Sequence, residues 1–455
     1  MATITTINPA TNQEIKTITL HTDDEVSQII SDAHDTFKNY RRSSFADRAV
    51  MMMKAADLLE ERKDIIAETM TLEMGKTYHA SQSEVDKCAW VCRYYAEHAQ
   101  EFLADEMVDT DASKSYISYR PLGVILAVMP WNYPLWQVFR FAAPALMAGN
   151  VALLKHASNV PESALHIEAI FRDAGFSEHA FRTLLIGSSQ VKKVLENPHV
   201  KAATLTGSGP AGAAVAALAG EHIKKTVLEL GGSDPYIVLD DADLDMAAKA
   251  CMTSRLLNAG QSCIGAKRFI IVESVYGKFL LKFKHEMESA RMGNPMQAVD
   301  IGPMARHDLR DEVHQQVIDS VSAGAILLSG GHIPDAEGAY YPPTILTDVK
   351  PGMPAYDDEI FGPVASVIKV KDESEAIAIA NDTEFGLGSC VFTEDIERGE
   401  RIARDEINAG SCFVNQYVMS DPRLPFGGIN TSGYGRELSY YGIREFVNIK
   451  TVYIK

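Results

Sequence analysis

The chain has 455 residues, 46% of them apolar and 23% charged, and it carries a formal net charge of −18. This length predicts two or three domains, and the composition is that of a soluble globular protein, which excludes a largely disordered chain. The negative charge disfavours nonspecific binding to nucleic acid or to anionic membranes, so any anionic ligand must be held by local positive groups.

Cysteine content and the apolar segments indicate a cytoplasmic protein without membrane anchorage. Six cysteines are too few for a disulfide scaffold in a chain of this length. The first residues, "MATITTINPATNQEI", lack the basic and apolar regions of a signal peptide. Residues 121–154 are strongly apolar, but Pro130, Pro134 and Pro144 interrupt them and they contain Arg140, so they are expected to be buried core. Cys88 and Cys92 have helical spacing without further zinc ligands, so no metal site is expected.

The order of predicted elements indicates an α/β fold. Residues 24–104 have the three- and four-residue apolar spacing of helices. Short β-rich runs then alternate with helical segments, which is typical of parallel sheets covered on both faces. These runs are 123–129, 151–155, 182–187, 202–207, 226–230, 235–239, 268–274, 325–330 and 365–370. The sequence "GGSDP" at 231–235 is the best candidate for a crossing between two α/β units.

A glycine-rich segment follows the strand predicted at 202–207. Gly207, Gly209 and Gly212 have the G-x-G-x-x-G spacing of dinucleotide-binding loops. That interpretation also needs an acid about 20 residues further on, to bind the ribose. Glu229 is the only acid near that distance at a strand end, and another role fits it better. A glycine-rich turn that starts an alanine-rich packed helix is the alternative.

Five further segments, taken together, are more specific. They are "PWNYP" at 130–134, "LLKHAS" at 153–158, "LELGG" at 228–232, "GQSC" at 260–263 and "EIFGPV" at 359–364. In this order and at these separations they closely resemble the aldehyde dehydrogenase superfamily. The resemblance runs from "NPAT" near the start to "LPFGGINTSGYGRE" at 424–437.

The resemblance implies an aldehyde dehydrogenase-like fold with two parallel-sheet α/β domains and a small β extension for oligomerisation. It also implies a homodimer or homotetramer. The expected parts are a discontinuous dinucleotide-binding domain (1–101 and 122–231), a catalytic domain (232–436) and the oligomerisation extension (102–121 and 437–455).

Three residues are expected to carry the chemistry. Cys263 is the natural nucleophile, because a thiolate adds readily to an aldehyde carbonyl. The amide of Asn132 and the backbone N–H of Cys263 would stabilise the resulting oxyanion. Glu229, between leucines at a strand end, suits the general base that hydrolyses the thioester, because apolar surroundings raise the pKa of a carboxyl group. An ordinary salt-bridged acid is the alternative for Glu229.

The cofactor is expected to be NAD or NADP. In the resembling family, Lys155 would bind the adenosine ribose, and Glu359 the nicotinamide ribose. Ser158 stands where NAD-preferring members often have glutamate, so the 2′-phosphate of NADP should be tolerated. The full set of expected cofactor residues is Trp131, Asn132, Lys155, Ser158, Gly207, Ser208, Leu230, Glu359 and Phe361.

Arg140 predicts the substrate. Succinate semialdehyde dehydrogenases resemble this chain in having arginine there, and a guanidinium in a partly desolvated tunnel matches a carboxylate. We expect Arg140 and Gln137 to bind substrate, although Arg140 could instead pair with a neighbouring acid. Another short aliphatic aldehyde, or an acyltransferase that uses coenzyme A, remain as alternatives. Some succinate semialdehyde dehydrogenases have a second cysteine two residues after the nucleophile, which allows a redox disulfide. This chain has Gly265 there, so no such disulfide is expected. Asn430 replaces the family's usual lysine and has no functional explanation.

Overall fold

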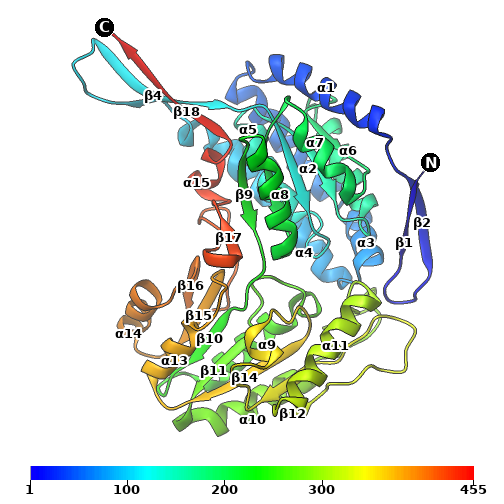
Figure 1. Ribbon diagram of the computed structural model, residues 1–455, viewed down its shortest axis with the longest axis vertical. Coiled ribbons are helices and arrows are strands. Elements are labelled where there is room, and N and C mark those ends of the chain that lie inside the picture. Colours follow the sequence, from blue (N-terminus) through cyan, green and yellow to red (C-terminus); the bar gives the residue numbers. More distant parts are fainter. Residues whose placement is uncertain (1) are drawn as a thin grey trace.

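The computed structural model describes residues 2–455, and two large sheets occupy separate halves of the molecule (Figure 1). An antiparallel hairpin at the amino terminus precedes four helices. The helices begin where the sequence provides caps: Thr22 with Glu25, and Ser44 with Asp47, form reciprocal capping boxes. These elements are β1 (Thr3–Ile7), β2 (Glu14–Thr19), α1 (Asp23–Tyr40), α2 (Phe45–Glu61), α3 (Lys63–Met74) and α4 (Tyr78–Phe102).

The first large sheet has six strands in the order β17-β9-β8-β5-β6-β7. All its pairs are parallel except β17 with β9. Its strands are β5 (Val124–Met129), β6 (Val151–His156), β7 (Phe181–Thr183), β8 (Val200–Thr206), β9 (Lys225–Glu229) and β17 (Gly433–Tyr434). Its helices are α5 (Trp136–Met147), α6 (Pro161–Asp173), α7 (Val191–Glu196) and α8 (Gly209–Glu221), with a 3-10 turn η1 (Ser188–Gln190).

The second large sheet has seven strands in the order β12-β13-β14-β11-β10-β15-β16, and only the β12–β13 pair is antiparallel. Its strands are β10 (Pro235–Val238), β11 (Arg268–Val272), β12 (Ile326–Ser329), β13 (Thr344–Thr347), β14 (Val364–Val370), β15 (Gly388–Phe392) and β16 (Ser411–Val414). Its helices are α9 (Leu244–Leu256), η2 (Leu257–Gly260), α10 (Glu273–Ser289), α11 (His307–Ser322), α12 (Pro354–Asp357), α13 (Glu373–Asn381), α14 (Ile396–Arg401) and the π turn η3 (Ile402–Glu406).

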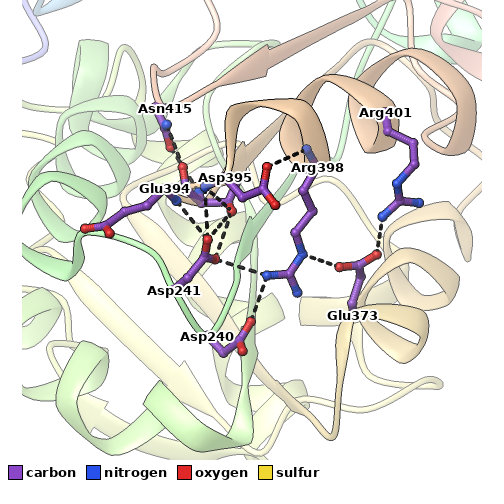
Figure 2. Close-up of polar contacts among 9 residues, drawn as sticks. Asp240, Asp241, Glu373, Glu394, Asp395, Arg398, Arg401 and Asn415 are labelled. Atoms are coloured by element: carbon purple, nitrogen blue, oxygen red, sulfur yellow. Dashed lines mark hydrogen bonds and ion pairs between the residues drawn. The ribbon is translucent and has the colours of Figure 1, made fainter.

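A polar network ties β10 to the connection between β15 and α14 (Figure 2). Asp241 accepts hydrogen bonds from Thr393 Oγ1 at 2.7 Å and from the backbone N–H of Asp395 at 3.0 Å, and it pairs with Arg398. Although burial opposes the effect, these bonds lower the pKa of Asp241. Arg398 also pairs with Glu373 of α13, so one guanidinium joins three elements at this end of the sheet.

A third, three-stranded sheet forms an arm that projects from the body, with the carboxyl terminus at its tip (Figure 1). Its elements are β3 (Glu106–Met107), β4 (Lys114–Pro121) and β18 (Val447–Ile454), and η4 (Asn430–Ser432) and α15 (Ser439–Arg444) precede β18. Ile449 on β18 is 64% exposed, and Tyr453 is 51% exposed. Much of the arm therefore has no apolar cover within residues 2–455.

The α/β class and the strand-rich runs predicted from the sequence are confirmed, whereas β1, β2, β13, β15, β16 and β17 were not predicted. The division into domains stays a prediction. Within residues 2–455, no helix is long and apolar enough to cross a membrane. Over the same range, no three His, Cys, Asp or Glu side chains gather where they could hold a metal ion.

Candidate active site

Cys263 lies in the loop between η2 and β11, close to the point where the two large sheets meet. The loop follows three residues of η2 with left-handed backbone, since φ is 54° at both Asn258 and Ala259 and 75° at Gly260. A Cβ at Gly260 would lie 2.2 Å from the carbonyl of Gly362, so only glycine fits there. The backbone therefore turns sharply just before Cys263.

The Cys263 thiol is half-buried. Burial raises its pKa to about 12, and the positive charges of Arg140 and Lys267 oppose that rise. Cys412 is half-buried as well, and Cys88, Cys92, Cys251 and Cys390 are buried. The two cations therefore favour the thiolate of Cys263, against the effect of burial.

Asn132 contacts the loop that carries Cys263. Its Nδ2 donates to the carbonyl of Gln261 at 3.1 Å, and its own carbonyl accepts from Asn258 Nδ2 at 2.7 Å. The structure thus brings Asn132 and the cysteine loop together. Gln137, expected to touch substrate, donates from Nε2 to Asn132 Oδ1 at 3.0 Å. That bond fixes which way the Asn132 amide points, a positioning role that the sequence did not reveal.

Glu229 ends β9 and is 2% exposed. Neither carboxylate oxygen has a hydrogen-bond partner among residues 2–455. Burial raises the pKa of Glu229 well above its ordinary value, and the charge of Glu437 adds to the rise while Arg140 opposes it. A Cβ at Gly427 would lie 2.7 Å from Glu229 Oε1, so glycine leaves room for the carboxylate. An unpaired carboxylate with a raised pKa suits a general base.

Arg140 pairs with an acid, which was the alternative to a substrate role expected from the sequence. It is 2% exposed, and its Nε forms an ion pair with Glu437, a residue that sequence reasoning missed. The guanidinium also lies 4.5 Å from the ring centroid of Phe426, and Nη2 approaches Thr206 Oγ1 at 3.4 Å. These contacts use two of the five N–H donors of an arginine. The substrate role of Arg140 stays a prediction.

Glu359 and Phe361 lie where the two halves of the molecule face each other. Glu359 accepts from the backbone N–H of Gly232 at 3.2 Å and pairs with Lys267 at 3.2 Å. A Cβ at Gly231 would be 2.3 Å from Glu359 Oε2, so the glycine after Leu230 allows this approach. Phe361 meets the Trp131 ring edge-on, with centroids 5.9 Å apart.

The amino terminus of α8 and the end of β6 would receive the other end of a dinucleotide. Ser208 is the N-cap of α8, and its side chain makes no capping bond. The first N–H groups of such a helix can bind a phosphate. Burial lowers the pKa of Lys155, at the end of β6. Ser158 is exposed and lines a cavity of about 320 Å³. Gly207 precedes Ser208, and these residue types fit a dinucleotide.

Asn430 now has a structural explanation. Its φ is 55°, a left-handed conformation that asparagine tolerates better than most residues. Its Nδ2 donates weakly, at 3.4 Å, to the carbonyl of Phe385. Asn430 therefore suits the turn into η4.

The structure is that of an α/β protein in which Asn132 contacts the loop that carries Cys263, and Lys267 links that loop to Glu359. A family described as "Aldehyde dehydrogenase family" matches residues 1–452, and the chain belongs to that family. The family resemblance drawn from the sequence is thereby confirmed.

The most similar proteins match along their whole lengths. A "Probable succinate-semialdehyde dehydrogenase [NADP(+)]" of Synechocystis sp. is 54% identical over 452 residues, covering 99% of each chain. A "Succinate-semialdehyde dehydrogenase [NADP(+)] 1" of Mycobacterium tuberculosis is 54% identical over 455 residues, again covering 99% of each. The crystal structure of a succinic semialdehyde dehydrogenase from Streptococcus pyogenes, in complex with NADP+, has a TM-score of 0.97 and 39% identity, covering 99% of each chain.

Proposed function

We propose that this protein oxidises succinate semialdehyde to succinate, with NAD or NADP as the hydride acceptor. The observation that carries the substrate is the full-length similarity, at 54% identity, to two proteins named for that reaction with NADP. Family membership supports the oxidation of an aldehyde through a cysteine. Cys263, Asn132 and Glu229 would carry the individual steps of the reaction.

The first half-reaction forms a thioester on Cys263. The thiol of Cys263 gives its proton to a water molecule. The sulfur then attacks the aldehyde carbon, and a C–S bond forms as the carbonyl electrons move to oxygen. The amide of Asn132 and the backbone N–H of Cys263 donate to that oxyanion. When the C=O bond re-forms, hydride leaves the carbon and a thioester remains. The cofactor, when bound, supplies the hydride acceptor.

The second half-reaction needs a base, and Glu229 suits it. Its carboxylate takes a proton from water, and the oxygen of that water bonds to the thioester carbon. The C–S bond then breaks, which releases the carboxylic acid and returns the sulfur of Cys263. Because Glu229 is otherwise unpaired, it is free to accept this proton.

The cofactor would be held at two places. The amino terminus of α8, beginning after Gly207 and Ser208, would bind its phosphates, with Lys155 and Ser158 at the adenosine ribose. Glu359 would bind the nicotinamide ribose, with Trp131, Leu230 and Phe361 beside the ring. Because Ser158 has no charge to repel a 2′-phosphate, NADP is accepted.

Arg140 would bind the carboxylate of the substrate, with Gln137 beside it on α5. Both are buried, and three N–H donors of Arg140 remain after its contacts to Glu437 and Thr206. A carboxylate held by a desolvated guanidinium gains a charge-assisted hydrogen bond. This contact would distinguish succinate semialdehyde from an uncharged aldehyde of similar length.

The test is a substrate panel measured by the absorbance of the reduced cofactor. Succinate semialdehyde should have the highest kcat/KM, above butanal, and both cofactors should support turnover. Water should serve as the acyl acceptor, so that added coenzyme A does not change the product. A preference for butanal would reassign the substrate, and an acyl-coenzyme A product would reassign the second half-reaction.

The domain division and assembly are further parts of the proposal. The six-stranded sheet would bind the dinucleotide, the seven-stranded sheet would carry Cys263, and the arm would join subunits of a dimer or tetramer in the cytoplasm. The exposed apolar side chains of β18, such as Ile449, support that role for the arm. Sedimentation of the full chain and of an Ile449→Glu variant would test it, since an unchanged oligomer would exclude β18 from the contact.

A further inference from the structure

Two buried cations, Lys267 and Arg255, donate to backbone carbonyls of the segment around Cys263. Lys267 is 3% exposed, and its Nζ donates to the carbonyls of Ser262 at 3.1 Å, Cys263 at 2.8 Å and Gly265 at 3.3 Å. Arg255 is fully buried and donates from Nη2 to the carbonyl of Gly260 at 2.5 Å. Four carbonyls of one short loop therefore point toward positive charge.

The bond to Ser262 fixes the direction of a group on the opposite side. The carbonyl of Ser262 and the N–H of Cys263 belong to one planar trans peptide, so they point in opposite directions. With the carbonyl oxygen held by Lys267, the N–H of Cys263 faces away from the cation. Within residues 2–455, no backbone carbonyl accepts from that N–H. It is left as a free donor beside the thiol.

The counter-charge of Lys267 is a residue of the proposed cofactor cleft. Glu359 Oε1 lies 3.2 Å from Lys267 Nζ and accepts from Gly232 N at the same distance. The ammonium thus lies between Glu359 and the nucleophile loop. A cation bound to a carbonyl also polarises the peptide, which makes its N–H a stronger donor.

We propose that Lys267 is a positioning residue that holds the Ser262–Cys263 peptide so that the N–H of Cys263 can stabilise the oxyanion of the reaction. Lys267 contacts no substrate; it acts through the peptide. The inference rests on the proposed role of Cys263, and it is independent of which aldehyde the enzyme prefers.

The experiment compares two reactions of the same thiol in the full-length enzyme. Acylation by p-nitrophenyl acetate passes through a tetrahedral oxyanion, whereas alkylation by iodoacetamide does not, and neither needs the cofactor. Both use the thiolate, so the ratio of their rates at one pH cancels any change in the pKa of Cys263. A Cys263→Ala variant gives the background from the other cysteines.

Lys267→Met should lower the acylation-to-alkylation ratio by about 10- to 100-fold, less than the loss of an entire oxyanion donor, because the N–H remains but is no longer fixed. Lys267→Arg keeps a cation and should recover part of that loss. Lys224→Met is the matched control, since Lys224 Nζ also donates to two backbone carbonyls, those of Leu195 and Asn197, away from the site. Its ratio should equal that of the parent.

A ratio for Lys267→Met within threefold of the parent would overturn the proposal, as would an equal fall in Lys224→Met. Thermal unfolding checks that each variant folds. If Lys267→Met does not fold, Lys267→Gln replaces it, and an unchanged ratio there has the same meaning. The aldehyde panel can fail while this ratio still falls, so an error in the proposed substrate is distinguishable from an error about Lys267.

Discussion

The pairing of Arg140 with Glu437 provides a sharp test of substrate selection. Both side chains are almost fully buried and contact each other. Removing one partner of such a pair typically costs about 3–5 kcal/mol of folding free energy, because the other charge is left unpaired. Arg140→Met and Glu437→Gln should therefore each destabilise the protein in urea, and the double variant should regain most of the loss.

In these variants, the preference for succinate semialdehyde over butanal should not follow the free energy of unfolding. A hydrogen bond to a charged group is worth about 1.5–3 kcal/mol, which corresponds to roughly 10- to 150-fold in kcat/KM. Arg140→Met and the double variant should lose that factor for succinate semialdehyde relative to butanal, whereas Glu437→Gln keeps the guanidinium and should keep the preference.

Reduced-cofactor absorbance measures both substrates with each variant. If the double variant regains the preference along with its stability, Arg140 is a structural partner of Glu437 and does not select the substrate. If Glu437→Gln loses the preference as fully as Arg140→Met, the pair acts as one structural unit, and the reasoning also fails.

The other predictions concern the chemistry and the cofactor. Cys263→Ala should lower aldehyde oxidation by at least about 1,000-fold while NADP binding measured by calorimetry is retained, and appreciable turnover would exclude the covalent route. Glu229→Gln should keep a hydride burst in stopped flow and lose roughly 100-fold in steady-state turnover, and a missing burst would move Glu229 to the first half-reaction. Burial raises the pKa of Glu229, and the base must be ionised, so as the pH is lowered the turnover of the parent should begin to fall at a pH above about 4.3, the ordinary pKa of a glutamate. Glu437→Gln removes a charge that raises this pKa, so it should shift the acid side of the pH profile to lower pH. An acid side that stays in place would show that another group titrates. Ser158→Glu should reduce kcat/KM with NADP by about 10- to 150-fold and change NAD use little, and equal losses would place Ser158 away from the 2′-phosphate.

Local patterns were enough to predict the α/β class and many of the strands in both large sheets. Lys155 was identified from the family resemblance and Glu229 from the resemblance and its place at a strand end, and the structure has both at or next to the ends of parallel strands. Each run is a few consecutive apolar residues, so its signal is local even though its hydrogen bonds are made with neighbouring strands. The strand β17 has only Gly433 and Tyr434, too short for any alternation to be visible.

Contacts between distant parts of the chain could not be predicted in the same way. Glu437 is an ordinary acid in the sequence, and only the fold brings it to Arg140 and raises the pKa of Glu229. Lys267 was passed over for a similar reason: a lysine near a cysteine is usually exposed, and its burial depends on the turn at Gly260 and on Glu359 from another segment. One sequence contains no information on such pairings beyond the motifs.

The pairing of β17 with β9 has a consequence for the order in which the enzyme matures. Gly433 lies opposite Glu229, and the carbonyl of Ser432 accepts from the N–H of Leu230 at 3.0 Å. The ribosome makes β17 long after β9, the strand with which it pairs. A nascent chain can form most of both large sheets and still lack β17, the edge strand that pairs with β9 at Glu229. Catalytic competence therefore depends on residues made long after Glu229, and a chain that stops before residue 430 should be folded in large part and inactive.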